Sequence, residues 1–264
     1  MSAISPAFYV VDGDSYLSTE HTRGPWGEGL QHAGPPSALL ARAIEAAADG
    51  LQVVRLGIDL LKPVPIVPLR IRVDERTGGK RRRVLEAVLC RADDGLELAR
   101  ATALLLRREA VETGELPLHD PEPPIGPDEA EAVDFGFFTG ELGYHTAMEL
   151  RCAAGGIGTG RTQMWMRPRV ALVDGEAMSP LQRLMTVADS GNGVSLVLDI
   201  REFAFTNPDL TVNIRREPRG DWLCLDARTH FQPHGLGMAE SRIWDADGVC
   251  ANGTQNLLLQ RRTA

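Results

Sequence analysis

The sequence lacks several features that would point to particular protein classes. Its four cysteines, Cys90, Cys152, Cys224 and Cys250, stand far apart with no C-x-x-C spacing, which argues against a zinc site and against a disulfide framework. No apolar run approaches the ~20 residues that a membrane-spanning helix needs, and the N-terminus has no basic stretch followed by an apolar one. We therefore expect a cytoplasmic protein with reduced, mostly buried thiols and no membrane partner.

The sequence also has fewer basic than acidic residues. The chain has 28 Lys and Arg against 36 Asp and Glu, a net charge of -8, whereas general nucleic-acid binders are normally basic. We expect no nucleic-acid partner. Three local basic segments are typical of solvated strand ends or hairpin tips, although one of them could meet an anionic ligand tail: Lys80–Arg83, Arg107–Arg108 and Arg261–Arg262.

Motifs for metal, dinucleotide and serine chemistry are missing as well. His230 and His234 have a spacing that a metal could use, but no third ligand follows at a matching interval. The glycines of "AAGGIGTGRT" do not form G-x-G-x-x-G, and no G-x-S-x-G stands anywhere in the chain. We therefore predict neither a metal nor an organic cofactor.

What the sequence does contain is a pattern of two helices, each followed by several strands. Apolar residues recur at helical spacing over 36–48, and 179–190 has Ser179 as its N-cap with a proline at the first helical position. The segment 110–135 is rich in proline and acid and is typical of a linker. The predicted strands are 53–61, 69–74, 83–91 and 96–107 after the first helix, and 203–205, 210–215, 222–231, 238–244 and 253–259 after the second.

The two halves of the chain look like copies of one unit. When Pro36 is laid on Pro180 without gaps, the two helices coincide, and laying Gly95 on Gly248 aligns the final strands of both halves. Each unit has one helix followed by an antiparallel meander, and a sheet wrapped around the helix would bury its mainly apolar surface. We predict an N-terminal repeat over 1–109, a linker over 110–135 and a C-terminal repeat over 136–264.

This arrangement resembles the acyl-CoA thioesterase II (TesB-like) family. The resemblance rests on "GLQHAGPPSALLARAIEAA" in the first half and on "MTVADSGNG", "FAFTNPDLTV" and "GTQNLLL" in the second, and it covers nearly the whole chain except the linker. It implies an α+β double hot-dog fold, in which two antiparallel sheets each wrap around a long central helix. It also implies an acyl-CoA substrate and a homo-oligomer.

The same resemblance suggests catalytic residues. Members of the family hydrolyse acyl-CoA with an Asp, a Ser, Thr or Asn, and a Gln, and these positions match Asp189, Asn207 and Gln255. For Asn207 a rival alignment would place Val197 there, and Asn is a departure from a hydroxyl in either case. The gapless matches give Glu45, Pro63 and Thr102 as the first-half counterparts, which leans slightly toward one working site in the second half.

Thioester hydrolysis requires a positioned water, a base and donors for the oxyanion. Asp189 would be the base or water orienter, and Asn207 and Gln255 would hold the water. The start of the first helix would bind the thioester carbonyl, because a helix N-terminus presents free amides and the positive end of its dipole. The candidate substrate-binding residues are His32, Gly34, Ser37 and Ala38.

Each candidate residue also has a purely structural interpretation. Asp189 could be a polar helix end, Asn207-Pro208-Asp209 could be a turn, and Gln255 could be an exposed strand residue. For His32 a structural role, capping the helix or packing on Trp26, is favoured over proton transfer. At the level of function, two alternatives remain open: a non-catalytic acyl-CoA or acyl-carrier binding protein of the same fold, and a hot-dog hydratase or dehydratase, for which the sequence shows no Asp–His pair.

Overall fold

Two helices form the centre of the molecule. The computed structural model describes residues 7–115, 120–138 and 140–262. The central helices are α1 (Gly34–Ala46) and α3 (Pro180–Ala188). Three shorter helical segments are η1 (Glu20–Thr22), α2 (Tyr144–Ala147) and α4 (Gly191–Val194). None of the helices in these ranges is long and apolar enough to cross a membrane.

The starts of both central helices follow from local sequence. Ser179 caps α3 by accepting the Gln182 N–H at 3.1 Å, and the Gln182 side chain accepts the Ser179 N–H at 3.3 Å, which is a capping box. Helix α1 begins two residues earlier than predicted, at Gly34. Pro35 and Pro36 fit there because the first turn of a helix has no intrahelical acceptor for their missing N–H groups.

The strands form a single sheet rather than two. Within the described residues, fourteen strands follow one another in the order β10-β1-β2-β4-β5-β6-β3-β12-β15-β14-β13-β9-β8-β7, and β11 pairs with β15. All pairs are antiparallel except β1 with β10. The bounds in the first half are β1 (Ala7–Asp12), β2 (Ser15–Ser18), β3 (Gln52–Leu60), β4 (Pro68–Thr77), β5 (Arg82–Arg91) and β6 (Glu97–Leu106). Those in the second half are β7 (Glu131–Val133), β8 (Met148–Gly155), β9 (Arg161–Pro168), β10 (Ala171–Val173), β11 (Phe203–Thr206), β12 (Asp209–Ile214), β13 (Leu223–Phe231), β14 (Leu236–Asp245) and β15 (Gly248–Arg261).

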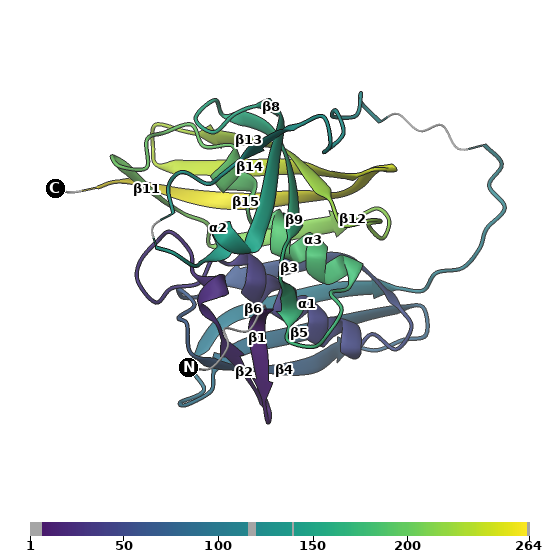
Figure 1. Cartoon of the computed structure of the whole chain (residues 1–264). Helices are drawn as coiled ribbons and strands as arrows, with labels where there is room; N and C mark the ends of the chain where they lie inside the picture. The colour runs from purple at the N-terminus through teal and green to yellow at the C-terminus, as the bar shows by residue number, and fades with distance from the viewer. Residues whose placement is uncertain (1–6, 116–119, 139, 263–264) are drawn as a thin grey trace.

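The prediction of two sheets is therefore wrong where the sheets of the two halves join. Strand β3 of the first half pairs with β12 of the second, for example Ile58 with Leu210 and Leu56 with Val212. These four side chains are buried, so joining the strands continues the core from one half to the other. Figure 1 shows the first-half strands on one side of α1 and α3 and the second-half strands on the other.

Each half nevertheless repeats the same order of neighbours. Strands β4-β5-β6-β3 follow α1, and β13-β14-β15-β12 follow α3. Helix α1 packs on β3, β4, β5 and β6, and α3 packs on β9, β12 and β13. This shared order supports the duplication that the sequence indicated. The predicted linker is not entirely irregular, because β7 lies inside it and pairs with β8.

The two central helices lie against each other in opposite directions. At one end, a Cβ on Gly34 would come within 2.4 Å of the Thr186 carbonyl oxygen, so only glycine permits this approach of α1 to α3. At the other end, the Ser179 hydroxyl and the Gln182 amide donate to the Glu45 carboxylate. The start of each helix therefore meets the end of the other, which creates two comparable junctions between the halves.

Candidate active site

The three residues predicted to hold a water converge at the first of these junctions. Asp189 follows the last turn of α3, Asn207 lies between β11 and β12, and Gln255 is on β15. Asn207 Nδ2 donates to Asp189 Oδ1 at 2.8 Å. Gln255 Nε2 donates to the same oxygen at 3.1 Å and to the Asp189 carbonyl at 3.0 Å. Two amides thus hold one carboxylate, although the residues are up to 66 positions apart in the chain.

Gln255 is placed inside the molecule by the alternation of β15. Its side chain is only 2% exposed, which excludes the interpretation of an exposed strand residue. Its Oε1 accepts the backbone N–H of Asn192 at 3.0 Å, and this contact orients the amide so that Nε2 points to Asp189. Both Nε2 hydrogens are then used on Asp189, so Gln255 positions the carboxylate.

A glycine allows the segment after Asp189 to come this close. A Cβ on Gly191 would lie 2.6 Å from Ser241 Oγ and 3.1 Å from Gln255 Oε1. A side chain at position 191 would therefore displace the Ser241 hydroxyl and the Gln255 amide, which would disturb the contact between Gln255 and the Asn192 N–H.

His32 lies on the other side of the carboxylate. Its Nδ1 is 3.2 Å from Asp189 Oδ2 and 3.1 Å from the Gly34 backbone nitrogen. One nitrogen cannot accept from Gly34 and donate to Asp189 at once. With the proton on Nε2, Nδ1 accepts the Gly34 N–H; with the proton on Nδ1, Asp189 accepts and the Gly34 amide is released. The contact with Gly34 agrees with the capping interpretation, and the ring stacks on Tyr144 rather than on Trp26.

Tyr144 of α2 covers the imidazole face. The two rings are 3.8 Å apart at their centroids with an interplanar angle of 1°. The Tyr144 hydroxyl donates to the Thr186 carbonyl at 2.8 Å and lies 2.9 Å from Ser190 Oγ. Burial lowers the pKa of His32 and outweighs the opposing influence of the Asp189 carboxylate. The imidazole is therefore neutral near neutral pH.

This lowered pKa predicts a specific loss of stability in acid. Below the ordinary pKa of 6.5 the unfolded chain takes up a proton on His32 before the folded protein does, so the unfolding free energy falls as the pH drops from there through the folded-state pKa. We expect the thermal midpoint of the wild type to fall more steeply over this range than that of His32→Gln. The exposed His234→Gln is the control, and parallel curves for wild type and His32→Gln would contradict the expectation.

The start of α1 offers fewer free amides than predicted. The Ser37 N–H donates to the Ala33 carbonyl at 3.0 Å, and Ala38 lies one residue further into the helix, where its N–H belongs to the helical ladder. Ser37 and Ala38 are therefore not available as backbone donors to a carbonyl. Gly34 remains, because its N–H is bound only by the His32 side chain.

A small cavity adjoins the carboxylate. It has a volume of about 20 Å³, and one water molecule needs roughly 10–15 Å³ measured in this way. The polar walls are His32, Asp189, Asn192, Asn207 and Gln255, together with Ser190. The apolar walls are Trp26, Phe135, Phe137 and Phe138.

Asn192 and the aromatic wall were not anticipated from the sequence. Asn192 is 5% exposed, and its Oδ1 is buried without a hydrogen-bond partner in the described part of the chain, a situation that is costly unless a ligand or water supplies one. A signal for the wall existed in "DFGFF", three phenylalanines within four positions of a chain with only 5% aromatic residues. That cluster straddles the end of the predicted linker.

The first-half counterparts of the site differ from those that the gapless match gave. The β5–β6 hairpin of the first half and the β14–β15 hairpin of the second each contain a bulge near the turn. The first pair beyond the bulge is Leu89 with Ala99 in one hairpin and Ile243 with Ala251 in the other. Four residues further along lie Ala103 and Gln255, so Ala103 replaces Thr102 as the counterpart of Gln255.

The counterpart of Asn207 changes by the same reasoning. Ala103 pairs with Leu56 on β3, and Thr254 pairs with Thr211 on β12, which sets Gln255 opposite Leu210. Three residues before Leu56 and Leu210 lie Val53 and Asn207. Pro63 was wrong because α4 and β11 lie between Asp189 and β12 and have no equivalent after α1. Glu45, the counterpart of Asp189, keeps a carboxylate at this end.

Ligands for a metal are not grouped in this structure. Among residues 7–115, 120–138 and 140–262, no group of three or more His, Cys, Asp or Glu side chains could hold a metal ion. The thiols of Cys90, Cys152, Cys224 and Cys250 are all free, and all but Cys152 are buried.

Comparisons with known proteins agree with this architecture. The acyl-CoA thioesterase N-terminal domain matches residues 22–106, and the acyl-CoA thioesterase C-terminal domain matches residues 119–259. No curated protein matches the chain in sequence at a significant level.

Solved structures with the same fold are similar over nearly the whole chain. A candidate thioesterase II from Thermobifida fusca has a TM-score of 0.77 at 17% identity, covering 96% of this chain and 95% of that one. A hot-dog protein from Alicyclobacillus acidocaldarius has 0.72 at 18%, covering 98% of each. The acyl-CoA thioesterase II TesB2 from Mycobacterium marinum has 0.65 at 16%, covering 96% and 95%.

Proposed function

The chain belongs to the acyl-CoA thioesterase family and is a thioester hydrolase, and we propose that it cleaves acyl-CoA by direct attack of a water held beside Asp189, Asn207 and Gln255. The observation that carries this mechanism is the convergence of both amides on the Asp189 carboxylate next to a cavity of one-water size. No covalent intermediate is needed in this scheme. The finer description of the fold as a double hot-dog, with repeats over 1–109 and 136–264 joined by 110–135, is part of the same proposal.

The attacking water needs an acceptor for each of its two hydrogens, so that a lone pair points at the thioester carbon. Asp189 accepts one hydrogen and removes it as the general base. Asn192 Oδ1, which is buried and has no hydrogen-bond partner among the described residues, accepts the other. Asn207 and Gln255 hold Asp189 in place, so the base is oriented before the substrate arrives.

The oxyanion is stabilised at the start of α1. When the His32 proton is on Nδ1 and is donated to Asp189, the Gly34 N–H is free to bind the carbonyl oxygen. It lies at the positive end of a 13-residue helix, which favours negative charge. His32 therefore acts on both partners: it orients the base and determines whether the Gly34 amide is available.

Release of free thiol from a panel of acyl-CoA substrates, from short to long chains, tests the proposal. We expect turnover with at least one chain length and no requirement for added metal. Saturable binding without turnover of any chain would overturn it. That result would instead identify a non-catalytic acyl-CoA or acyl-carrier binding protein of the same fold.

The role of Asn192 can be tested separately. Asn192→Leu keeps the size of the side chain but removes the acceptor, and loss of one hydrogen bond to the water should lower kcat about tenfold, with KM changed less than about twofold. The matched control is Asn252→Leu, an exposed residue on β15, which should leave kcat within about twofold of the wild type. An unchanged kcat in a folded Asn192→Leu protein would show that the water does not depend on Asn192.

A further inference from the structure

A larger recess lies at the second junction between α1 and α3, where Glu45 meets the start of α3. Its volume is about 320 Å³. The first half contributes Glu45, Ala48 and Val53 to its walls, and the second half contributes Leu181, Ile214 and Glu217. Like the cavity at Asp189, this recess is built by both halves of the chain.

The recess occupies the place that corresponds to the proposed active site in the other half. Glu45 and Ala48 are the counterparts of Asp189 and Asn192 on the helices, and Val53 is the counterpart of Asn207 by the number of residues before Leu56 and Leu210. Residues from all three positions line the recess at this end, as their counterparts line the cavity at the other.

Its chemistry differs from that of the active site. Ala48 and Val53 are apolar on its wall where Asn192 and Asn207 are polar, and Ala103 behind it replaces Gln255, although Gln52 adds one amide to the wall. The Glu45 carboxylate is already bound by the Ser179 hydroxyl at 2.7 and 2.8 Å and by Gln182 Nε2 at 2.9 Å. Burial raises the pKa of Glu45 in spite of these donors. The recess therefore combines an apolar wall with a carboxylate that is already hydrogen-bonded, and it has no counterparts of the Asn192 and Gln255 amides.

A basic recess adjoins the apolar one. The two share Gly50 and Leu51, and the second, of about 590 Å³, is lined by Lys80, Arg83 and Arg107. Arg108 lies on the wall of the first. Arg83 is paired with Asp49 and Glu75, and Arg107 is paired with Glu109. In the described part of the chain Lys80 and Arg108 have no carboxylate within ion-pair distance.

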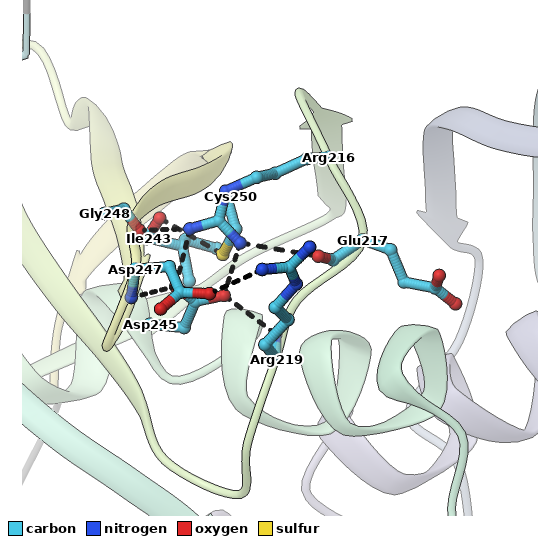
Figure 2. Close-up of polar contacts among 8 residues, drawn as sticks. All are labelled: Arg216, Glu217, Arg219, Ile243, Asp245, Asp247, Gly248 and Cys250. Carbon is cyan, nitrogen blue, oxygen red and sulfur yellow. Dashed lines mark hydrogen bonds and ion pairs between the residues drawn. The ribbon is translucent and has the colours of Figure 1, made fainter. Parts of the chain in front are cut away.

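The opposite wall is held in place by a partly buried ion pair. Arg216 binds both oxygens of Asp245, at 2.5 and 2.6 Å, and the backbone N–H of Arg219 donates to Asp245 at 2.8 Å. Figure 2 shows these contacts, with the Glu217 side chain directed away from the cluster. The segment that carries Glu217 and Pro218 to the recess is therefore anchored to the end of β14.

We propose that this recess is a second binding site for coenzyme A and its thioesters, one that binds them without hydrolysis. The nucleotide phosphates lie at Lys80 and Arg108, and the pantetheine and acyl arm lies on the apolar wall around Leu51, Val53 and Leu181. The class of ligand rests on the function proposed above. The site itself rests on the recess, its charge and its correspondence to the active site.

Calorimetric titration with a non-hydrolysable thioether analogue of an acyl-CoA tests this proposal. We expect two sites per chain in the wild type. The pair Lys80→Glu and Arg108→Glu should weaken one site at least about tenfold, because two charge-assisted phosphate contacts are reversed. Hydrolysis at low substrate concentration should be unchanged. The matched control is Arg228→Glu with Arg242→Glu, two exposed arginines on β13 and β14, which should leave both sites intact.

The titration separates failure of this site from failure of the proposed function. If the wild type binds the analogue at one site only, and a substitution at the Asp189 cavity removes that site, the proposed second site is overturned while the proposed hydrolytic function still stands. Two sites without turnover of any acyl-CoA support the second site and overturn the hydrolytic function. Equal binding of an analogue that ends at pantetheine and lacks all phosphates would overturn the role of Lys80 and Arg108. The variant Leu51→Trp, which fills the recess, should abolish the second site independently of charge.

Discussion

Asp189→Asn is expected to lower kcat at least about 100-fold, because the general base is lost while the substrate can still bind. The substitution is nearly isosteric, and its hydrogen bonds can persist. The remaining oxygen can accept from Asn207 and Gln255 as Asp189 Oδ1 does. The new amide group stands at the position of Oδ2, where it can donate to His32 Nδ1. Free-thiol release at saturating acyl-CoA measures the effect.

The thermal midpoint should change little, so loss of activity will not be a consequence of unfolding. Asp59→Asn is the matched control, because Asp59 is an exposed carboxylate on β3 outside the cavity, and its kcat should stay within about twofold of the wild type. If Asp189→Asn retained wild-type turnover, Asp189 would not be the base. If neither protein turned over any substrate but both bound it, the chain would be a binding protein.

Asp245→Ala is expected to lower the free energy of unfolding by about 3 kcal/mol, because it leaves the partly buried Arg216 guanidinium without its carboxylate. The Asp245 side chain is fully buried, and it also accepts the backbone N–H groups of Arg219 and Asp247 at 2.8 Å each. Both amides would lose their acceptor in the variant (Figure 2). Chemical denaturation at neutral pH measures the loss.

The control and the pH dependence make this prediction specific. Asp247→Ala removes only the exposed pair with Arg219 and should cost less than about 1 kcal/mol. Burial alone would raise the pKa of Asp245, but the hydrogen bonds from Arg216 and the two amides outweigh it, so the pKa is lowered from 3.8. The contribution of Asp245 is therefore present above pH 3.8 and is lost as the pH falls through the folded-state pKa. Equal stability of Asp245→Ala and Asp247→Ala would contradict this account.

Local signals in the sequence predicted both central helices and most strands of the two meanders. The capping box at Ser179 and the apolar period after Pro36 depend only on neighbouring residues, so α1 and α3 lie within two residues of their expected bounds. Strands β1, β2, β7, β8, β9 and β10 were missed. The first two surround a Gly turn near the N-terminus, β8 and β9 flank the glycine-rich segment 155–160, and β7 and β10 have only three residues each, too few to show an alternation.

The joining of the two sheets could not be predicted in the same way. The pairing of β3 with β12 depends on which buried faces meet, and no local pattern specifies a partner about 150 residues away. The gapless comparison of the halves failed for a related reason. An insertion between helix and sheet, or a one-residue change of register, moves every later position to another face.

At the candidate site, the order of the motifs that resemble the acyl-CoA thioesterase family indicated Asp189, Asn207 and Gln255. The structure places these three side chains in contact. The role proposed for Asn192 was not predictable, because it depends on an oxygen that is buried and has no partner within the part of the chain that the structure describes. The role of His32 was predictable only in part. Its position before two prolines indicated a cap, but its contact with Asp189 exists only because α1 and α3 run in opposite directions.

The continuous sheet also determines where a further strand could be added. Both ends of its strand order are three-residue strands, β7 and β10, which are too short to template a neighbour. The longest stretch of open edge is on β4, whose pairing with β2 stops at Leu69. Beyond it, Arg70, Arg72 and Asp74 are exposed and charged. Charged side chains on an open strand oppose the addition of a strand from another molecule.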